Sequence, residues 1–475
     1  MKMDFTNLLF LFIFLPIALV IYHIADIKVK EIILLAISLL FYALGSLKYL
    51  LLFVTLIVLS VGIGRGINLI KRQYLKRVLL VAGIIANLVP LLYYKYTDFS
   101  IETWNQLSGQ KISLHNLALP LGISFFTFKA VSYLVDIYRN TAVLAKNPLH
   151  DALYLSFFTQ VQSGPLSRYN ELNFCMNSEI YNRGKLFSEG ASRFMIGFSK
   201  KILLANMLAM VVDEIYATPF ENFTVGFAWL GSICYSLQLF FDFSGYSDMA
   251  IGLTEMFGYR CKENFIYPYT TESVSKFWRK WHISLSEWFR DYIYIPMGGS
   301  RSKHAWKVYF NLLIVWLLTG IWHGANWTFV VWGLGYFVLI SFEKLVGWPE
   351  RFNSKFTKIL WRIVSLFFIN VQWILFRSKD LISGFRFIKR LFICNYNEIT
   401  NTRMLLLMRQ YGLFIILAIV LSTPVVPYIL KKGEKNIITK TTIEVVVGVI
   451  VAFAFIWSIS LVLSGLNNPF AYANF

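Results

Sequence analysis

The chain has 475 residues, of which 57% are hydrophobic and only 15% charged, and its mean hydropathy is +0.58. Soluble domains carry about 25% charged residues, so this composition excludes an ordinary soluble protein. The net charge of +19 comes from basic residues in short loops between apolar runs. That distribution argues against a nucleic-acid-binding protein and indicates contact with the anionic surface of a lipid bilayer.

Apolar runs close to the length of a bilayer span predict an all-α, polytopic membrane protein with roughly 10–12 spans. In chain order, the predicted spans are residues 5–24, 31–45, 47–64, 78–96, 117–137, 188–216, 225–256, 308–322, 326–345, 360–377, 411–430 and 442–464. Neither a repeat nor a domain-sized linker interrupts them, so residues 1–475 are expected to form a single membrane domain.

The distribution of lysine and arginine predicts the orientation of the spans. The basic loop 65–77 is expected to be cytoplasmic, which places the amino terminus outside and the basic loops 260–290 and 301–307 inside. Residues 377–409 fall outside under this count although they are also basic. Either a re-entrant segment is missed there, or that part of the topology is wrong.

Two segments before the last third of the chain are not expected to be simple spans. Residues 154–168 are too short to cross and end in Gly164-Pro165, which cannot continue a helix, so they are predicted to be re-entrant. Residues 276–294 alternate basic and aromatic side chains, which is typical of an amphipathic helix at or just below the membrane surface. The side chains that would share one face of that helix are Trp278, Trp281, His282, Leu285 and Trp288/Phe289.

A third such segment is the turn 322–326 between two apolar runs, and it contains His323. An ionisable group at membrane depth is costly and indicates a functional site. Imidazole can accept a proton from a hydroxyl nucleophile near neutral pH, so we predict that His323 is a general base. Trp322 and Trp327 would exclude water, and Asn326 could orient the ring or an oxyanion. The structural alternative is a histidine that caps the turn by hydrogen bonding.

His282 and two carboxylates are further candidates. His282 is either an ordinary interface residue or a second active-site group reached from the cytoplasm. Asp242 and Asp248 lie six residues apart in an apolar run, so they do not share a helix face. They either hold helices together through hydrogen bonds or belong to the site. The sequence has no HExxH-type spacing, and we predict no catalytic metal.

Several stretches, taken in order, resemble the membrane-bound O-acyltransferase family, and within it the membrane subunits of bacterial alginate and related polysaccharide O-acetylation systems. They are Gly164-Pro165 with Arg168, residues 241–248 (FDFSGYSD), Asn264-Phe265 with Pro268-Tyr269, residues 277–286 (FWRKWHISLS) continuing through 288–299, and residues 318–327 (LTGIWHGANW). Together they cover about residues 120–345, which would be the core of the domain.

The resemblance implies a ring of helices around a central tunnel in a thinned core, where a cytoplasmic donor and an extracytoplasmic acceptor approach from opposite faces. It implies that His323 and His282 are the two active-site histidines. Further residues expected to bind or orient the substrates are Asn326, Trp322, Trp278, Arg290, Asp291, Asp242, Ser244, Tyr246 and Asp248.

The tail, residues 465–475, contains Tyr472 in an F-x-Y-x-x-F pattern. This pattern resembles the terminal motif of acyl-transfer components in related systems, which would make Tyr472 an acyl relay. The alternative is an aromatic anchor at the membrane interface.

Taken together, the sequence predicts an O-acyltransferase in the bacterial inner membrane that uses no bound cofactor. We expect the acyl group to be acetyl, from acetyl-CoA or an acyl-carrier thioester docked near His282 and Arg290, and the acceptor to be an exported glycan. The resemblance implies a separate extracytoplasmic partner of the serine-esterase type that completes transfer to sugar, since the chain itself has no GxSxG-like elbow or soluble domain. The alternatives are D-alanyl transfer to teichoic acid from a carrier protein and, from another class, a membrane transporter.

Overall fold

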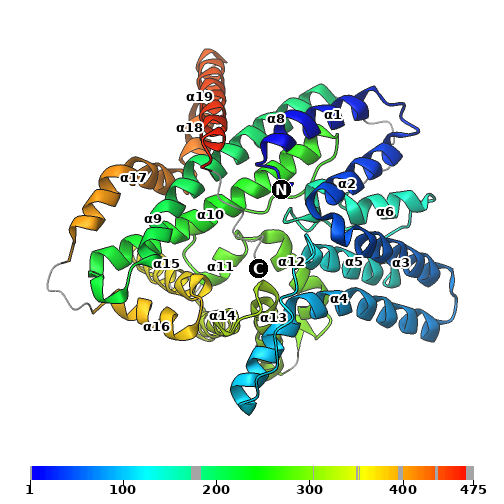
Figure 1. Cartoon of the computed structure of the whole chain (residues 1–475), viewed down its shortest axis with the longest axis horizontal. Helices are drawn as coiled ribbons and strands as arrows, with labels where there is room; N and C mark the ends of the chain where they lie inside the picture. The colour runs from blue at the N-terminus through cyan, green and yellow to red at the C-terminus, as the bar shows by residue number, and fades with distance from the viewer. Residues whose placement is uncertain are drawn as a thin grey trace. The chain divides into compact units, whose positions relative to one another are not determined.

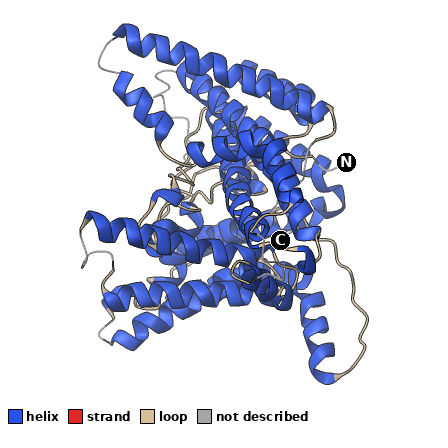
Figure 2. Cartoon of the chain, turned by 90° about the vertical axis from the view of Figure 1, so that its left-hand side faces the viewer, coloured by secondary structure: helices blue, strands red, loops and turns tan. Residues whose placement is uncertain are grey.

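The computed structural model describes residues 3–172, 183–302, 304–348, 351, 354–393, 399–433 and 437–466 (Figures 1 and 2). All regular secondary structure in these residues is helical, as predicted. Eight helical segments of the described chain are long and apolar enough to cross a membrane. They are Lys30–Leu69, Gln73–Ser108, Gly184–Ala217, Ala305–His323, Trp327–Val346, Lys355–Arg377, Thr402–Leu421 and Lys440–Leu463.

This count is smaller than the roughly 10–12 spans expected from apolar run length, because several runs form other kinds of helix. The first run forms the short apolar helix Phe10–Ile24. The two runs 31–45 and 47–64 belong to one helical segment, in which α2 (Lys30–Ser46) and α3 (Leu50–Leu69) are joined by a single 3₁₀ turn. Residues 117–137 give only the 16-residue α5 (Ile123–Tyr138).

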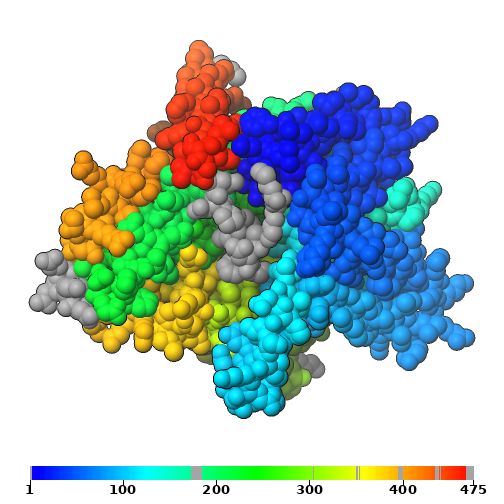
Figure 3. All heavy atoms as spheres, in the orientation of Figure 1, coloured from blue at the N-terminus to red at the C-terminus, as the bar shows by residue number. Residues whose placement is uncertain are grey.

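The described chain also contains a long helix that is not among these eight segments. This helix, α10 (Val225–Met256), has 32 residues and carries the polar motif 242–248. By contrast, α17 (Thr402–Leu421) and the apolar part of α19 (Ile437–Leu463) are exposed, with 11% of their apolar windows buried. Both lie on the surface in the space-filling view, where they are coloured orange and red (Figure 3).

The chain divides into two compact units, and the divisions fall within α8 (Arg183–Ser199) and α10. Unit 1 comprises Met1–Phe194 and Ser247–Glu263, and unit 2 comprises Met195–Tyr246 and Asn264–Phe475. The prediction that residues 1–475 form a single membrane domain stays a prediction.

In unit 1, the segment predicted to be re-entrant forms two short helices, α6 (Pro148–Ser156) and α7 (Phe158–Val161). Irregular backbone at membrane depth is tolerated only where protein satisfies its polar groups. Here the buried Lys129 on α5 donates to the Tyr154 carbonyl (2.6 Å) and to Gln160 Oε1 (3.3 Å). Tyr154 in turn donates its hydroxyl to the Ser167 carbonyl. The loop after α7 therefore has protein partners.

In unit 2, α13 (Ala305–His323) and α14 (Trp327–Val346) form a hairpin whose connection is the turn predicted at residues 322–326. Gly320 and Gly333 bring the two backbones close, because a Cβ at Gly320 would lie 2.4 Å from the Phe329 carbonyl oxygen. A Cβ at Gly333 would lie 2.4 Å from the Trp316 carbonyl oxygen. Small residues allow this close packing between membrane helices.

The single amphipathic helix predicted for residues 276–294 is wrong. The segment forms α11 (Val274–Trp278), α12 (Ile283–Phe289) and a π-helical turn at Arg290–Tyr294. The helix breaks at His282, whose φ of 45° lies in the left-handed region. The Ile283 N–H donates to the Asn264 carbonyl and the Ile266 N–H to the Lys280 carbonyl, and these two hydrogen bonds stabilise the interruption of the helix. All six side chains assigned to one face are nevertheless buried.

Candidate active site

His323 is the last residue of α13, and only 2% of it is exposed. Three aromatic rings surround its imidazole. The ring centroids of Trp322 and Trp332 are each 4.9 Å away, and that of Phe376 is 5.3 Å away, all in edge-on geometry. These rings come from α13, α14 and α15 (Lys355–Arg377), so three helices fix the position of the imidazole and shield it from solvent.

His282 is completely buried, and its hydrogen bond assigns its tautomer. Its Nδ1 lies 3.2 Å from Asn264 Oδ1. That oxygen also accepts from the Ser284 backbone N–H (3.2 Å) and hydroxyl (2.9 Å), so it is an acceptor, and His282 Nδ1 must carry the proton. The lone pair is therefore on Nε2. Burial lowers the pKa of His282 to about 3, so the ring is neutral at physiological pH.

Trp322 connects the two histidines. Its ring centroid is 4.9 Å from that of His323 and 6.3 Å from that of His282. The sequence-predicted pair of histidines is therefore brought together around one indole, although 41 residues separate them. Trp278 lies one layer farther out, 5.7 Å from Trp332.

The acidic and basic residues predicted near the site are largely engaged with one another. The exposed Arg290 bonds Asp291 (Nε to Oδ1, 2.7 Å) and lies 3.9 Å from Glu287. Its positive charge is therefore partly compensated, which weakens it as a binder of an anionic donor. Asp291 is thus an ion-pair partner of Arg290.

Asp242 and Asp248 belong to different units and have different partners. Asp242 forms an ion pair with Lys201 (2.5 Å), and both side chains are almost fully buried. Lys201 lies in a π-helical segment, Lys200–Ala205, between α8 and α9 (Asn206–Ala217). Such segments often mark functional sites. Asp248, in unit 1, bonds Arg193 (3.0 and 3.1 Å).

The motif around Asp242 also supports His282. Phe243, the next residue, packs edge-on against the His282 ring at 4.5 Å. Gly245 allows α10 to approach α8, because a Cβ there would lie 2.7 Å from the Gly197 carbonyl oxygen. Ser244 and Tyr246 are buried on the same helix. Their predicted contact with substrate stays a prediction.

Asn326 caps α14, since its side chain accepts from the Thr328 backbone N–H (2.9 Å). Its amide nitrogen donates to the Lys379 carbonyl (2.8 Å). The predicted role of Asn326 in orienting the His323 ring or an oxyanion stays a prediction. The relay candidate Tyr472 lies outside the described residues. Among those described, no three His, Cys, Asp or Glu side chains gather as metal ligands would.

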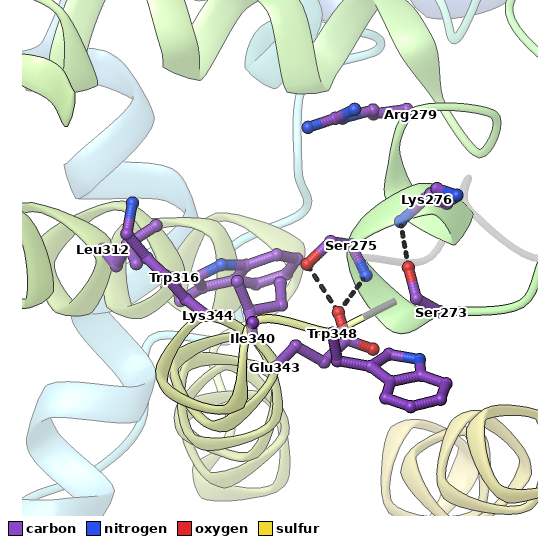
Figure 4. Close-up of a pocket in the computed structure, with 11 residues that line it drawn as sticks. Ser273, Ser275, Lys276, Arg279, Leu312, Trp316, Ile340, Glu343, Lys344 and Trp348 are labelled. Atoms are coloured by element: carbon purple, nitrogen blue, oxygen red, sulfur yellow. Dashed lines mark hydrogen bonds between the residues drawn. The ribbon is translucent and has the colours of Figure 1, made fainter. Parts of the chain in front are cut away.

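A cavity of about 400 Å³ lies beside α11 and the open end of the α13–α14 hairpin (Figure 4). It is lined by Ser273, Ser275, Lys276, Arg279, Leu312, Trp316, Ile340, Glu343, Lys344, Gly347 and Trp348. The Glu343 carboxylate bonds the backbone N–H groups of Val274 and Ser275 and the Ser275 hydroxyl (2.5–2.8 Å). Its negative charge is thus directed at the N-terminus of α11, and the cavity keeps a basic lining.

Some residues of the site were missed by sequence reasoning. Asn264 was noted only as part of a motif, and its role as the His282 partner depends on a fold-back that periodicity does not reveal. Lys201 lies within the predicted span 188–216, and its ion-pair partner Asp242 lies 41 residues away in the chain, so no local pattern indicates the pair. Trp332 and Phe376 resemble the other apolar residues of their spans, so the sequence does not reveal that both rings pack on His323.

The chain is similar to known membrane acyltransferases. Residues 123–378 match the model of the membrane-bound O-acyltransferase family. A probable alginate O-acetylase of Pseudomonas syringae pv. tomato is 40% identical over 385 residues, which cover 80% of this chain and 73% of that protein.

Two further relatives differ in their named substrates. The peptidoglycan O-acetyltransferase of Helicobacter pylori is 36% identical and is matched over 81% of this chain and 79% of its own length. The teichoic acid D-alanyltransferase of Bacillus subtilis is 29% identical over 62% of this chain and 77% of its own length.

Proposed function

The chain belongs to the membrane-bound O-acyltransferase family, and from that premise we propose that it transfers an acetyl group from a cytoplasmic thioester for O-acetylation of an exported glycan. Its acyltransferase family decides against the transporter alternative. The observation that carries the proposal is the pair of buried imidazoles that both lie near the Trp322 ring, at centroid distances of 4.9 and 6.3 Å. The enzyme is a multi-pass membrane protein, which we assign to the bacterial inner membrane.

His323 acts as the general base in the proposed reaction. It accepts the proton of the attacking hydroxyl while the hydroxyl oxygen forms a bond to the thioester carbonyl carbon. The carbon–sulfur bond then breaks, and the thiolate leaves with the proton that His323 carries. The surrounding rings of Trp322, Trp332 and Phe376 keep water from competing as the acceptor.

His282 is assigned a different task, because its ring stays neutral. With the proton on Nδ1 held by Asn264, the Nε2 lone pair can accept a hydrogen bond from the attacking hydroxyl or a donor group. Its left-handed backbone costs of order 1–3 kcal/mol, and such strain persists where the surroundings enforce it, typically at functional sites.

The cavity of Figure 4 is proposed to hold the phosphate-bearing part of the donor. Arg279 and Lys344 line it and form no ion pair within the described residues, so both can compensate phosphate charge. Trp316 forms one wall, and its ring lies 6.3 Å from that of Trp332, which contacts His323. Seven residues of α13 separate Trp316 from His323, or about 10 Å at 1.5 Å per residue, a distance that an extended thioester arm can span.

The first experiment compares base-labile acetate on exported glycans between wild type and His323→Ala at matched membrane levels. Loss of the ester supports the proposal, because the general base is then absent. His304→Ala is the matched control, since this exposed histidine directly precedes the same helix. If the variant keeps its ester, D-alanine ester is assayed in the same samples, and its loss there would favour the D-alanyl alternative.

The donor site is tested with two thioesters in purified membranes. Arg279→Gln/Lys344→Gln should raise KM for acetyl-CoA roughly tenfold or more, while the rate with a truncated acetyl thioester that lacks phosphate stays unchanged. Lys355→Gln/Lys358→Gln removes the same number of charges at the start of α15 and is the control. Equal KM values for wild type and both variants would exclude this cavity as the phosphate site.

The acceptor side rests on the relatives alone. The alginate O-acetylase and peptidoglycan O-acetyltransferase names support a glycan acceptor and the acetyl group, and their matches extend over more of this chain than the D-alanyltransferase match does. A serine-esterase-type partner that completes transfer to sugar, and an acyl relay at Tyr472, complete the proposal. Tyr472→Phe tests the relay, because it removes only the hydroxyl that would carry the ester.

A further inference from the structure

The short helix α16 (Leu381–Arg390) packs one face against the protein and exposes the other. It begins four residues after the membrane-spanning α15 ends at Arg377, and the next span, α17, begins at Thr402. The segment between two consecutive spans lies at one surface of the bilayer, so α16 is placed at the level of the lipid headgroups.

The inner face of α16 is fixed to the protein. Phe387 stacks on Tyr216 of α9 at 4.6 Å and meets Phe223 edge-on at 5.4 Å. A Cβ at Gly384 would lie 3.0 Å from Leu375 Cδ2, so α16 packs directly on the end of α15. Trp229 of α10 donates its indole N–H to the Leu391 carbonyl (3.0 Å). These contacts leave the helix no freedom to turn its other face inward.

The outer face combines large apolar side chains with cations. Ile382 is 66% exposed and Phe385 is 55% exposed. Arg386 and Lys389 are exposed on the same side of the helix, and neither forms an ion pair or a side-chain hydrogen bond within the described residues. Residues 377–409 as a whole carry seven Lys and Arg against two Asp and Glu. Exposure of Ile382 and Phe385 to water would be unfavourable, because both are large apolar side chains.

We infer that α16 is an interfacial helix that binds anionic phospholipid headgroups, with Ile382 and Phe385 inserted among the acyl chains and Arg386 and Lys389 on the phosphates. Amphipathic helices with this composition bind through buried apolar area together with attraction to anionic lipid. A glycan or a soluble anion would match the cations but not the exposed aliphatic and aromatic side chains. The inference does not depend on the acyl donor or acceptor.

The bound lipid would be adjacent to the catalytic turn. Lys379, two residues before α16, accepts the hydrogen bond from Asn326, and Phe376 at the end of α15 packs on His323. Lipid held by α16 therefore fixes the depth at which this end of α15 and the turn sit in the bilayer. This connects the proportion of anionic lipid in the membrane to the position of the site.

The test is native mass spectrometry of the purified full-length protein titrated with phosphatidylglycerol or phosphatidylcholine. Each cation near an anionic surface contributes about fivefold in affinity, so Arg386→Gln/Lys389→Gln should weaken the tightest phosphatidylglycerol site by roughly 25-fold. Retention of phosphatidylcholine should not change. The control, Lys431→Gln/Lys432→Gln, removes two exposed cations from the end of α18 (Val425–Gly433), which also lies between two spans. Because the tightest phosphatidylglycerol site is assigned to α16, the affinity of that site should change less than about twofold in this control.

Two further arms keep the outcome decisive. Ile382→Ser/Phe385→Ser should reduce retention of both lipids, because insertion is lost while the cations remain. Excess inorganic phosphate should not displace phosphatidylglycerol from the wild type. Unchanged phosphatidylglycerol affinity in the α16 charge variant, an equal loss in the α18 control, or full displacement by phosphate would each overturn the inference.

Discussion

A methyl group added at Gly320 should displace the catalytic turn, and the size of the displacement follows from the hairpin. A Cβ there would lie 2.4 Å from the Phe329 carbonyl oxygen, whereas ordinary van der Waals contact begins near 3.4 Å. The obstacle is backbone rather than the end of a flexible side chain, so α13 and α14 must separate by about 1 Å. His323 is only three residues farther along α13 and moves with it.

Gly320→Ala should therefore lower acyl transfer by on the order of 100-fold, since a displacement of about 1 Å in a catalytic group has costs of this size. Its overpacking should also cost about 1–3 kcal/mol of stability. Gly333→Ala acts on the same helix contact from the other side, because its Cβ would lie 2.4 Å from the Trp316 carbonyl oxygen. The double variant should then cost less than the sum of the two single variants, as one separation relieves both clashes.

The assay is the initial rate of transfer from a radiolabelled acetyl thioester in membranes with matched protein amounts, together with thermal stability by size-exclusion chromatography. Gly412→Ala is the control, because nothing lies within 4 Å of a Cβ at this position of α17. It should leave the rate unchanged. If the Gly320→Ala variant keeps the wild-type rate and stability, the close packing of α13 against α14 does not determine the position of His323.

Three further perturbations have defined outcomes. Burial lowers the pKa of His282 to about 3 in the folded protein, so the unfolded chain binds one more proton between pH 3 and the ordinary pKa of 6.5. The free energy of unfolding should therefore fall as the pH drops below 6.5, by up to about 1.4 kcal/mol per pH unit. His282→Gln should remove this component from the pH dependence of the melting temperature. Lys201→Met should cost about 3–5 kcal/mol by leaving Asp242 charged and buried, and Lys201→Met/Asp242→Leu should recover much of that loss in the same melting assay. Glu343→Gln should weaken the capping of α11 by about 1–2 kcal/mol and lower the thermal stability, whereas an unchanged melting temperature would mean that this bond contributes little.

Local patterns in the sequence were sufficient for the hairpin that carries His323. Hydropathy located both helices, and the polar, glycine-containing turn between them located the connection to within a few residues. The close contact of Gly320 with Gly333 was found only in the structure, although the two residues are only 13 positions apart in the chain. The helix lengths followed less directly from the apolar runs, since residues 117–137 gave the 16-residue α5, which is too short to be among the eight candidate spans of the described chain.

The second histidine shows where local reasoning fails. Periodicity placed His282 within one continuous helix, and the residues assigned to its apolar face are indeed buried. The break at His282 depends on Asn264, which lies 18 residues earlier and bonds both the His282 ring and the Ser284 backbone. The spacing of apolar residues along a helix does not reveal a hydrogen bond to a residue outside that helix. In the same way, the pairing of Asp242 with Lys201 could not be read from a spacing of 41 residues.

The two histidines lie at opposite kinds of helix end, and this difference bears on the roles proposed for them. His323 is the last residue of α13, where the aligned peptide dipoles leave a partial negative charge. His282 precedes the first residue of α12, where the partial charge is positive and favours the neutral ring. Burial acts on His282 in the same direction. This difference supports the proposal that a hydroxyl transfers its proton to His323 while His282 stays a hydrogen-bonding partner.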